Sequence, residues 1–210
     1  MQMEKTKYVS IGEFCMPSII IKDVLLAKQE SYPFDWVYSD VRTVINCVKD
    51  DFSELSKKLL ERKNDVVTEN LWFGIAHKNI KKDDDLQYYH RTIDRFRDLL
   101  NEHTGKVVFL HASYTNKQIY NTELSVERKA KLNELYDTIK EKSKTDFAIV
   151  SITFQKGESD YYKISKDGNI YVMEIFTKKE QILNTWIHHV QGHKSVIIPA
   201  FKALENEITV

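Results

Sequence analysis

Cys15 stands where a thiol could act as a nucleophile. The apolar run 5–11 predicts a short strand, Gly12 permits a tight turn after it, and an apolar periodicity predicts a helix that begins near Cys15. Unpaired backbone N–H groups at a helix N-terminus stabilise an anion, so we expect a lowered pKa for this thiol and a sulfur that solvent can reach. The same groups could hold the oxyanion that forms when sulfur attacks a carbonyl. The alternative is an inert cysteine that packs as a small apolar side chain.

A cysteine nucleophile also needs a base, and two of the seven histidines are suitably placed. His77 follows the aromatic stretch 71–76 in a predicted loop. His111 ends a predicted inner strand, a position that often faces a site. The spacing of the residues does not decide between these two bases. His103 has a structural interpretation, because a cation near a helix C-terminus is mildly stabilising.

The remaining histidines and acids do not form a convincing metal site. His189 and His193 are four residues apart, but no glutamate follows His189 and Gly192 weakens a helix between them. We therefore expect His188, His189 and His193 to form a solvated helix end. The acidic run Asp83–Asp85 is better explained as a helix start. No glycine-rich phosphate loop occurs, so neither a metal nor a cofactor is expected.

Strand and helix patterns alternate along the chain. Strands are predicted at 5–11, 71–76, 106–111, 147–154 and 169–176, and a further one before Pro199. Helices are predicted near 15–25, after Ser39 as N-cap, at 52–60, 83–100, 123–143 and 179–190. This alternation favours an α/β fold with a mostly parallel central sheet flanked by helices. No linker divides the chain, so we expect a single domain over residues 1–210. Segments 12–15 and 111–113 would follow two strand ends, where such sheets place functional groups.

Composition narrows the class of protein. Among 210 residues, the 31 basic side chains balance the 31 acidic ones, so no overall field attracts nucleic acid or anionic lipid. We expect no nucleic-acid partner and no membrane association, because no apolar run is long enough to span a bilayer or to form a signal peptide. Cys15 and Cys47 are too few for a disulfide framework, which predicts a reducing, cytoplasmic location. The sequence does not determine the oligomeric state.

Two blocks of sequence carry a family resemblance. Ser10-Ile-Gly-Glu-Phe-Cys15 and Ser31-Tyr-Pro-Phe-Asp-Trp36 resemble the opening of a domain-of-unknown-function family whose members are described as papain-like cysteine peptidases. Members share a Ser-Leu-Gly-x-x-Cys start, a Pro-Phe-Asp-Trp block, a histidine after an aromatic stretch and a basic helix. His77 matches the histidine, whereas His90 and His111 stand where the family has arginines. The resemblance extends to about residue 115.

The resemblance implies roles for three residues. Cys15 would be the nucleophile, His77 the base, and Asp35 an orienting or structural acid. The substrate would be a peptide, a protein or another acyl compound. The block Pro33–Trp36 has an equally good structural interpretation, in which Phe34 is an aromatic anchor and Asp35 accepts hydrogen bonds from backbone N–H groups of a turn.

Three functions follow from these patterns. The first is a cysteine-dependent hydrolase or acyl-transfer enzyme that uses Cys15 with His77 or His111. The second is a non-catalytic α/β binding module that interacts with a partner protein. The third is a glycan- or ester-processing hydrolase with Ser10 or Ser113 as nucleophile, although neither serine stands in a Gly-x-Ser-x-Gly elbow.

Overall fold

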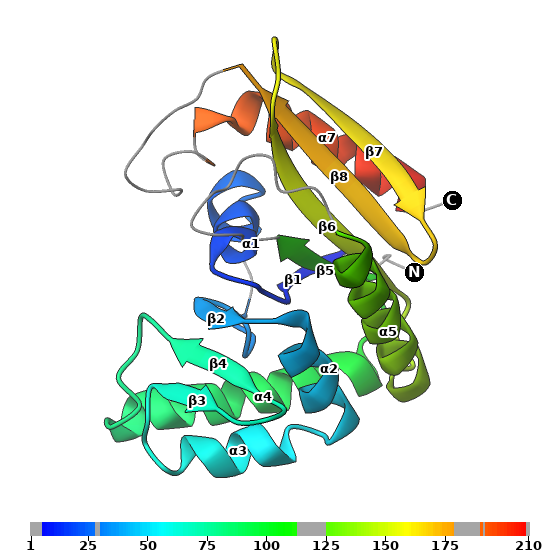
Figure 1. Ribbon diagram of the computed structural model, residues 1–210. Helices are drawn as coiled ribbons and strands as arrows, with labels where there is room; N and C mark the ends of the chain where they lie inside the picture. Colours follow the sequence, from blue (N-terminus) through cyan, green and yellow to red (C-terminus); the bar gives the residue numbers. More distant parts are fainter. Residues whose placement is uncertain (1–5, 28–29, 113–124, 179–189, 191, 209–210) are drawn as a thin grey trace.

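A five-stranded sheet lies at the centre of the molecule (Figure 1). The computed structural model describes residues 6–27, 30–112, 125–178, 190 and 192–208. The strand order is β1-β5-β6-β8-β7, and the strands are β1 (Lys7–Ser10), β5 (Val107–Ala112), β6 (Phe147–Lys156), β8 (Ile170–Thr177) and β7 (Tyr161–Asp167). The first four are parallel, and β7 adds an antiparallel edge. The predicted α/β class with a mostly parallel sheet is therefore confirmed.

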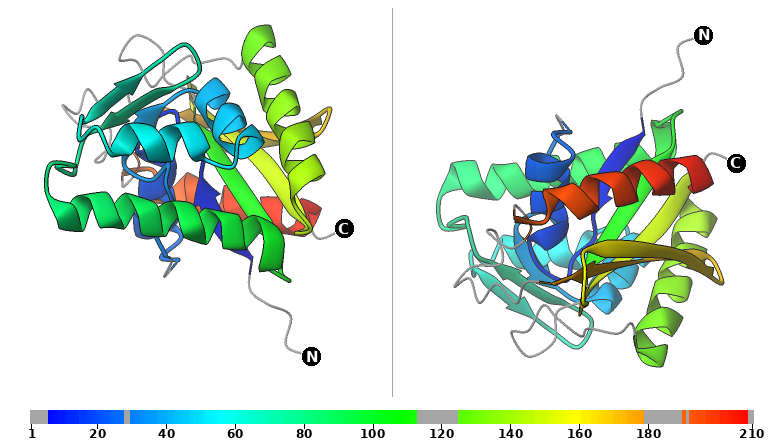
Figure 2. Two further views of the ribbon diagram at one scale, coloured as in Figure 1. Left: turned by 90° about the horizontal axis from the view of Figure 1, so that it is seen from below. Right: turned by 90° about the horizontal axis from the view of Figure 1, so that it is seen from above.

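Helices cover both faces of this sheet (Figure 2). One face packs against α2 (Val41–Lys49), α3 (Ser53–Leu59), α4 (Asp83–Glu102) and α5 (Val126–Lys142). The other face packs against α1 (Met16–Ile19), the π-helical turn η1 (Ile20–Val24) and α7 (Lys194–Ile208). All six residues of β5 are buried, because apolar layers lie on both sides of an inner parallel strand. No described helix is long and apolar enough to cross a membrane.

A second, smaller sheet lies beside the first. It is antiparallel, with the order β2-β4-β3, and its strands are β2 (Val37–Ser39), β4 (Trp72–Ile75) and β3 (Asp65–Val67). The sequence predicted only the strand that became β4. β2 and β3 have three residues each, too few for a recognisable alternation of apolar and polar side chains.

The Gly12–Glu13 segment joins the two sheets. The Ala112 N–H donates to the Gly12 carbonyl (3.0 Å), and the Glu13 N–H donates to the Ala112 carbonyl (3.2 Å). On the other side, the Ser39 N–H donates to the Glu13 carbonyl (3.0 Å). Gly12 has φ of +92°, and a Cβ there would lie 2.7 Å from Ser39 Oγ. Only glycine fits this position, and Cys15 follows it three residues later in the segment between β1 and α1.

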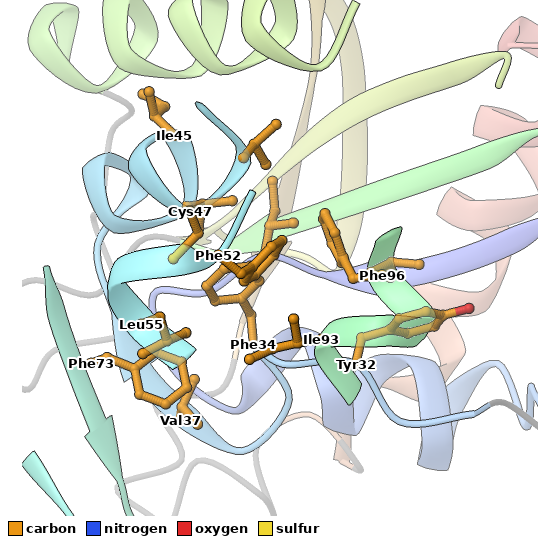
Figure 3. Close-up of a cluster of buried hydrophobic side chains, with 14 of the residues drawn as sticks. Tyr32, Phe34, Val37, Ile45, Cys47, Phe52, Leu55, Phe73, Ile93 and Phe96 are labelled. Atoms are coloured by element: carbon orange, nitrogen blue, oxygen red, sulfur yellow. The ribbon is translucent and has the colours of Figure 1, made fainter. Parts of the chain in front are cut away.

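Phe34 of the Pro33–Trp36 block lies at the centre of an aromatic cluster (Figure 3). Its side chain is fully buried, and its ring centroid lies 5.9 Å from that of Phe96, 6.0 Å from that of Phe52 and 6.2 Å from that of Phe73. These edge-to-face and tilted contacts join the block to α3, α4 and β4. The structural interpretation of Phe34 is therefore correct.

Several predicted elements need correction. The N-cap of α2 is Asp40, not Ser39, since Asp40 Oδ1 accepts the Thr43 N–H at 2.7 Å. Strand β7 was not predicted, because its side chains are mostly exposed and polar. The strand expected before Pro199 is part of helix α7: apolar residues three and four apart are buried on one face, while Pro199 lies on the exposed face. The predicted helix 179–190 lies outside the described residues except for Val190.

Replacement of Gly12 by alanine tests the joint between the sheets. We expect Gly12→Ala to lower the free energy of unfolding by about 1–3 kcal/mol, because alanine at this φ is strained and its Cβ meets Ser39 Oγ. Urea denaturation measures the loss. Ser39→Ala in the same chain should recover part of it, since it removes the nearest atom and leaves the φ strain. Equal losses with and without Ser39→Ala would show that the close contact does not matter.

Candidate functional site

Cys15 and His77 lie side by side, although 62 residues separate them in the sequence. Cys15 is the N-cap residue of α1, and His77 lies in the loop between β4 and α4. The distance from Cys15 Sγ to His77 Nε2 is 3.9 Å. The imidazole also meets the Trp36 ring edge to face, with 5.6 Å between the centroids. Of the two predicted bases, His77 is therefore the one placed beside the sulfur.

The thiol of Cys15 is not activated in the way the sequence predicted. Its side chain is only 2% exposed, and this burial raises the pKa of Cys15 to about 11, although the backbone N–H of the same residue opposes the increase. The expectations of a lowered pKa and of an accessible sulfur are both wrong. Helix α1 continues directly into η1, and the loss of water at its first residues disfavours the thiolate more strongly than the helix N-terminus favours it. At neutral pH Cys15 is a neutral thiol beside an imidazole.

Asp85 anchors the loop that carries His77. Its Oδ2 accepts the Asn79 N–H at 2.9 Å, and its Oδ1 pairs with Lys78 Nζ at 3.1 Å. The Asn79 N–H and the Lys78 ammonium lower the pKa of Asp85. The Lys78 ammonium also lies 4.6 Å from the centroid of the Tyr88 ring. Sequence reasoning explained Asp85 only as part of a helix start and missed this positioning role.

Asp35 holds its own turn together. Its Oδ1 accepts the Ser18 hydroxyl and its Oδ2 accepts the Tyr32 N–H, both at 3.0 Å. Burial raises the pKa of Asp35 to about 6, and these two hydrogen bonds offset only part of the increase. Both carboxylate oxygens therefore bond to groups other than His77. Of the two roles predicted for Asp35, the contacts favour the structural one.

His111 belongs to a different group of polar side chains. It is fully buried, its Nδ1 lies 3.0 Å from Ser151 Oγ on β6, and its Nε2 lies 3.7 Å from Glu13 Oε1. Glu13 in turn accepts two hydrogen bonds from the Arg128 guanidinium, at 2.9 and 3.2 Å. Both ring nitrogens of His111 thus face groups other than Cys15. Sequence analysis did not predict the contact between Glu13 and Arg128, because it joins residues 115 positions apart.

Other predicted site residues have structural roles. Ser10 is fully buried, and its hydroxyl donates to the Phe34 carbonyl at 3.4 Å, so it is not placed as a nucleophile. Ser113, His188 and His189 lie outside the described residues. His193 is buried near Asp160 rather than solvated, which corrects the expected helix end. His103 is the C-cap residue of α4, as expected. The described part of the chain contains no group of three or more potential metal ligands.

The loop anchor can be tested with a matched pair of variants. We expect Asp85→Ala to accelerate hydrogen exchange of the Asn79 amide by at least about tenfold, because the amide loses its charged acceptor. Asp84→Ala removes an exposed carboxylate from the same helical turn and should leave the exchange rate unchanged. Equal exchange rates in the two variants would contradict the anchoring role. Exchange followed by NMR measures the rates.

The raised pKa of Asp35 predicts that the stability of the protein depends on pH. Between pH 3.8 and about 6 the carboxyl ionises in the unfolded chain but stays protonated in the folded one, so its contribution to stability falls as pH rises. We expect Asp35→Asn to gain about 2 kcal/mol relative to the parent protein between pH 4 and pH 7, because one pKa unit is worth about 1.4 kcal/mol and solvent exposure reduces the effect. Urea denaturation of both proteins at the two pH values measures this gain. If the difference in unfolding free energy between Asp35→Asn and the parent protein is the same at pH 4 and pH 7, Asp35 has an ordinary pKa.

One of the three comparisons with known proteins found a match. Residues 6–157 match the model of the DUF1796 family, which is described as "Putative papain-like cysteine peptidase". No similar protein was found among the curated proteins, and no similar structure was found among the solved structures. The matched range includes Cys15, Asp35, His77 and His111, and it ends just after β6. The match covers more than half of the chain, and the chain therefore belongs to the DUF1796 family.

Proposed function

We propose that the protein is a cysteine-dependent hydrolase or acyl-transfer enzyme with Cys15 as nucleophile and His77 as base. The observation that carries this proposal is the 3.9 Å distance between Cys15 Sγ and His77 Nε2. A nucleophile and its base need to come within hydrogen-bond reach, and such contacts are often longer before a substrate binds. The family description supports the same class of chemistry. The proposed substrate is a peptide, a protein or another acyl compound.

The raised pKa of Cys15 determines the order of the proton transfers. The neutral thiol gives its proton to His77 Nε2 as sulfur attacks the carbonyl carbon and the C–S bond forms. The carbonyl electron pair moves to oxygen, and backbone N–H groups at the start of α1 are the proposed donors to this developing charge. When the oxyanion collapses, the bond to the leaving group breaks and the imidazolium protonates that group. Water or a second nucleophile then cleaves the thioester.

Trp36 and Asp35 support the imidazole indirectly. The Trp36 indole packs against the edge of the His77 ring and restricts the orientation of that ring. Asp35 holds the preceding turn through its hydrogen bonds with Ser18 and Tyr32. In this proposal Asp35 and Trp36 are positioning residues, and neither exchanges a proton with the substrate. Both cysteines of the chain are free thiols, which supports the proposed reducing, cytoplasmic location.

The second candidate function is a non-catalytic module that binds a partner protein. The burial of the sulfur and the raised pKa of Cys15 favour it, because inert structural cysteines have these properties. Under this interpretation His77 packs against Trp36 and does not affect the reactivity of the thiol. The two candidates therefore differ in whether removal of the imidazole changes the chemistry of the sulfur.

Alkylation of Cys15 by iodoacetamide distinguishes the two candidates. We expect His77→Gln to slow alkylation at pH 7.5 by at least about tenfold, because a neutral thiol reacts only when a base takes its proton. His90→Gln should leave the rate unchanged. Mass spectrometry of the labelled peptide measures the rate, with the fully buried Cys47 as an internal reference. Equal rates in the parent protein and in His77→Gln would favour the binding module.

Turnover provides the complementary measurement. A panel of p-nitrophenyl esters and fluorogenic peptides reports acyl transfer, and Cys15→Ser should abolish any hydrolysis that the parent protein shows. If Cys15→Ser and His77→Gln retain full activity on every hydrolysed substrate, the proposed mechanism is wrong.

A further inference from the structure

A cavity of about 310 Å³ lies between α1 and η1 on one side and the 30–36 segment on the other. Its lining residues are Ser18, Ile21, Lys22, Ala27, Glu30, Ser31, Asp35 and Trp36. Ser18 follows Cys15 by three residues, the spacing at which helical side chains share a face. Trp36 forms a wall of the cavity and contacts the His77 ring. The cavity therefore shares the Trp36 ring with His77 and lies one helical turn from Cys15, although neither Cys15 nor His77 lines it.

The cavity holds a half-buried carboxyl group, that of Asp35, which has no cationic partner in the part of the chain that the structure describes. Asp35 accepts hydrogen bonds from Ser18 and Tyr32, but no lysine or arginine among the described residues forms an ion pair with it. A carboxylate can accept about four hydrogen bonds, so Asp35 keeps capacity for two more. Burying a carboxylate without a counter-ion is costly, and this cost is the reason that the pKa of Asp35 is raised. A bound cation would remove this cost.

The other walls suit a flat or slender cation. The Trp36 indole offers an aromatic face, on which guanidinium and ammonium groups are held by the electrons of the ring. Lys22 Nζ already lies 5.5 Å from the centroid of that ring, which shows that a cation is accommodated there. Glu30 adds a second carboxylate among the lining residues. Lys22 itself forms no ion pair with Asp35, so it does not neutralise the carboxylate. Because its ammonium group lies over the Trp36 ring, it would compete with a cationic ligand for that ring.

We propose that this cavity binds a guanidinium or alkylammonium group, with Asp35 as its counter-ion and Trp36 as its stacking wall. This inference deepens the proposed function and, for the substrate, rests on it: the enzyme prefers acyl substrates that carry an arginine-like or lysine-like side chain beside the scissile bond. The cavity volume is at the small end of ligand sites, which matches one side chain and not a whole ligand.

Calorimetric titration of the full chain with n-butylguanidinium tests the cavity itself. We expect binding of n-butylguanidinium and none of the neutral isostere n-butylurea. Asp35→Asn should weaken binding by at least about tenfold, because the counter-ion is lost. Lys22→Met should strengthen binding about two- to fivefold, because it removes a competing positive charge near the site. This second variant keeps the test decisive if Asp35→Asn does not fold.

The outcomes separate the cavity from the catalysis. Cys15→Ser should bind n-butylguanidinium as the parent protein does, so a result in this variant is independent of turnover. Equal affinity for n-butylurea and n-butylguanidinium would overturn the cation site. Unchanged binding of n-butylguanidinium in both single variants, Asp35→Asn and Lys22→Met, would overturn it as well. If n-butylguanidinium binds but hydrolysed peptides show no preference for basic side chains, the cavity is a cation site and its role as a substrate subsite is wrong.

Discussion

The backbone hydrogen bonds of Gly12 and Glu13 are the constraint on which the candidate site depends. They tie the end of β1 to β5 on one side and to β2 on the other. Because the chain is fixed in this way, Cys15 begins α1 at a defined place, and β2 and β4 lie close enough for the next loop to bring His77 to the sulfur. The pair is thus a product of contacts between two sheets and not of any local motif.

The same packing that brings the two side chains together removes water from the sulfur. Cys15 is buried at the start of α1, and its thiol is held neutral beside His77, which is exposed. An enzyme built in this way would generate its thiolate only when a carbonyl is present, which limits reactions with other electrophiles. The site thus combines a buried nucleophile with an exposed base, and the Trp36 ring packs against that base.

The sequence predicted those features that depend on local pattern or on recognisable blocks. Local pattern predicted helix α4 from its apolar stripe and strands β5 and β6 from their apolar runs. The recognisable blocks singled out Cys15, Asp35 and His77 as candidate site residues. The choice of His77 over His111 needed the three-dimensional structure, because it depends on how distant segments pair. The pKa of Cys15 was predicted in the wrong direction, because periodicity shows where a helix begins but not what covers its first residue. Pro199 misled the prediction of α7, since exposed proline is tolerated where the opposite helix face supplies the packing.

The last two strands of the main sheet lie outside the range that matches the family. β8 pairs with β6 along eight residues of each strand, from Ile149 to Lys156 and from Ile170 to Thr177. Without this partner, β6 would present a long, apolar row of free amide and carbonyl groups, a surface that recruits other chains. β7 ends the sheet instead with an exposed strand that carries Lys163 and Lys166. The strands that protect the edge of β6 are therefore remote in sequence from the proposed chemistry, and a substitution in β7 or β8 would act on strand pairing and not on the Cys15–His77 pair.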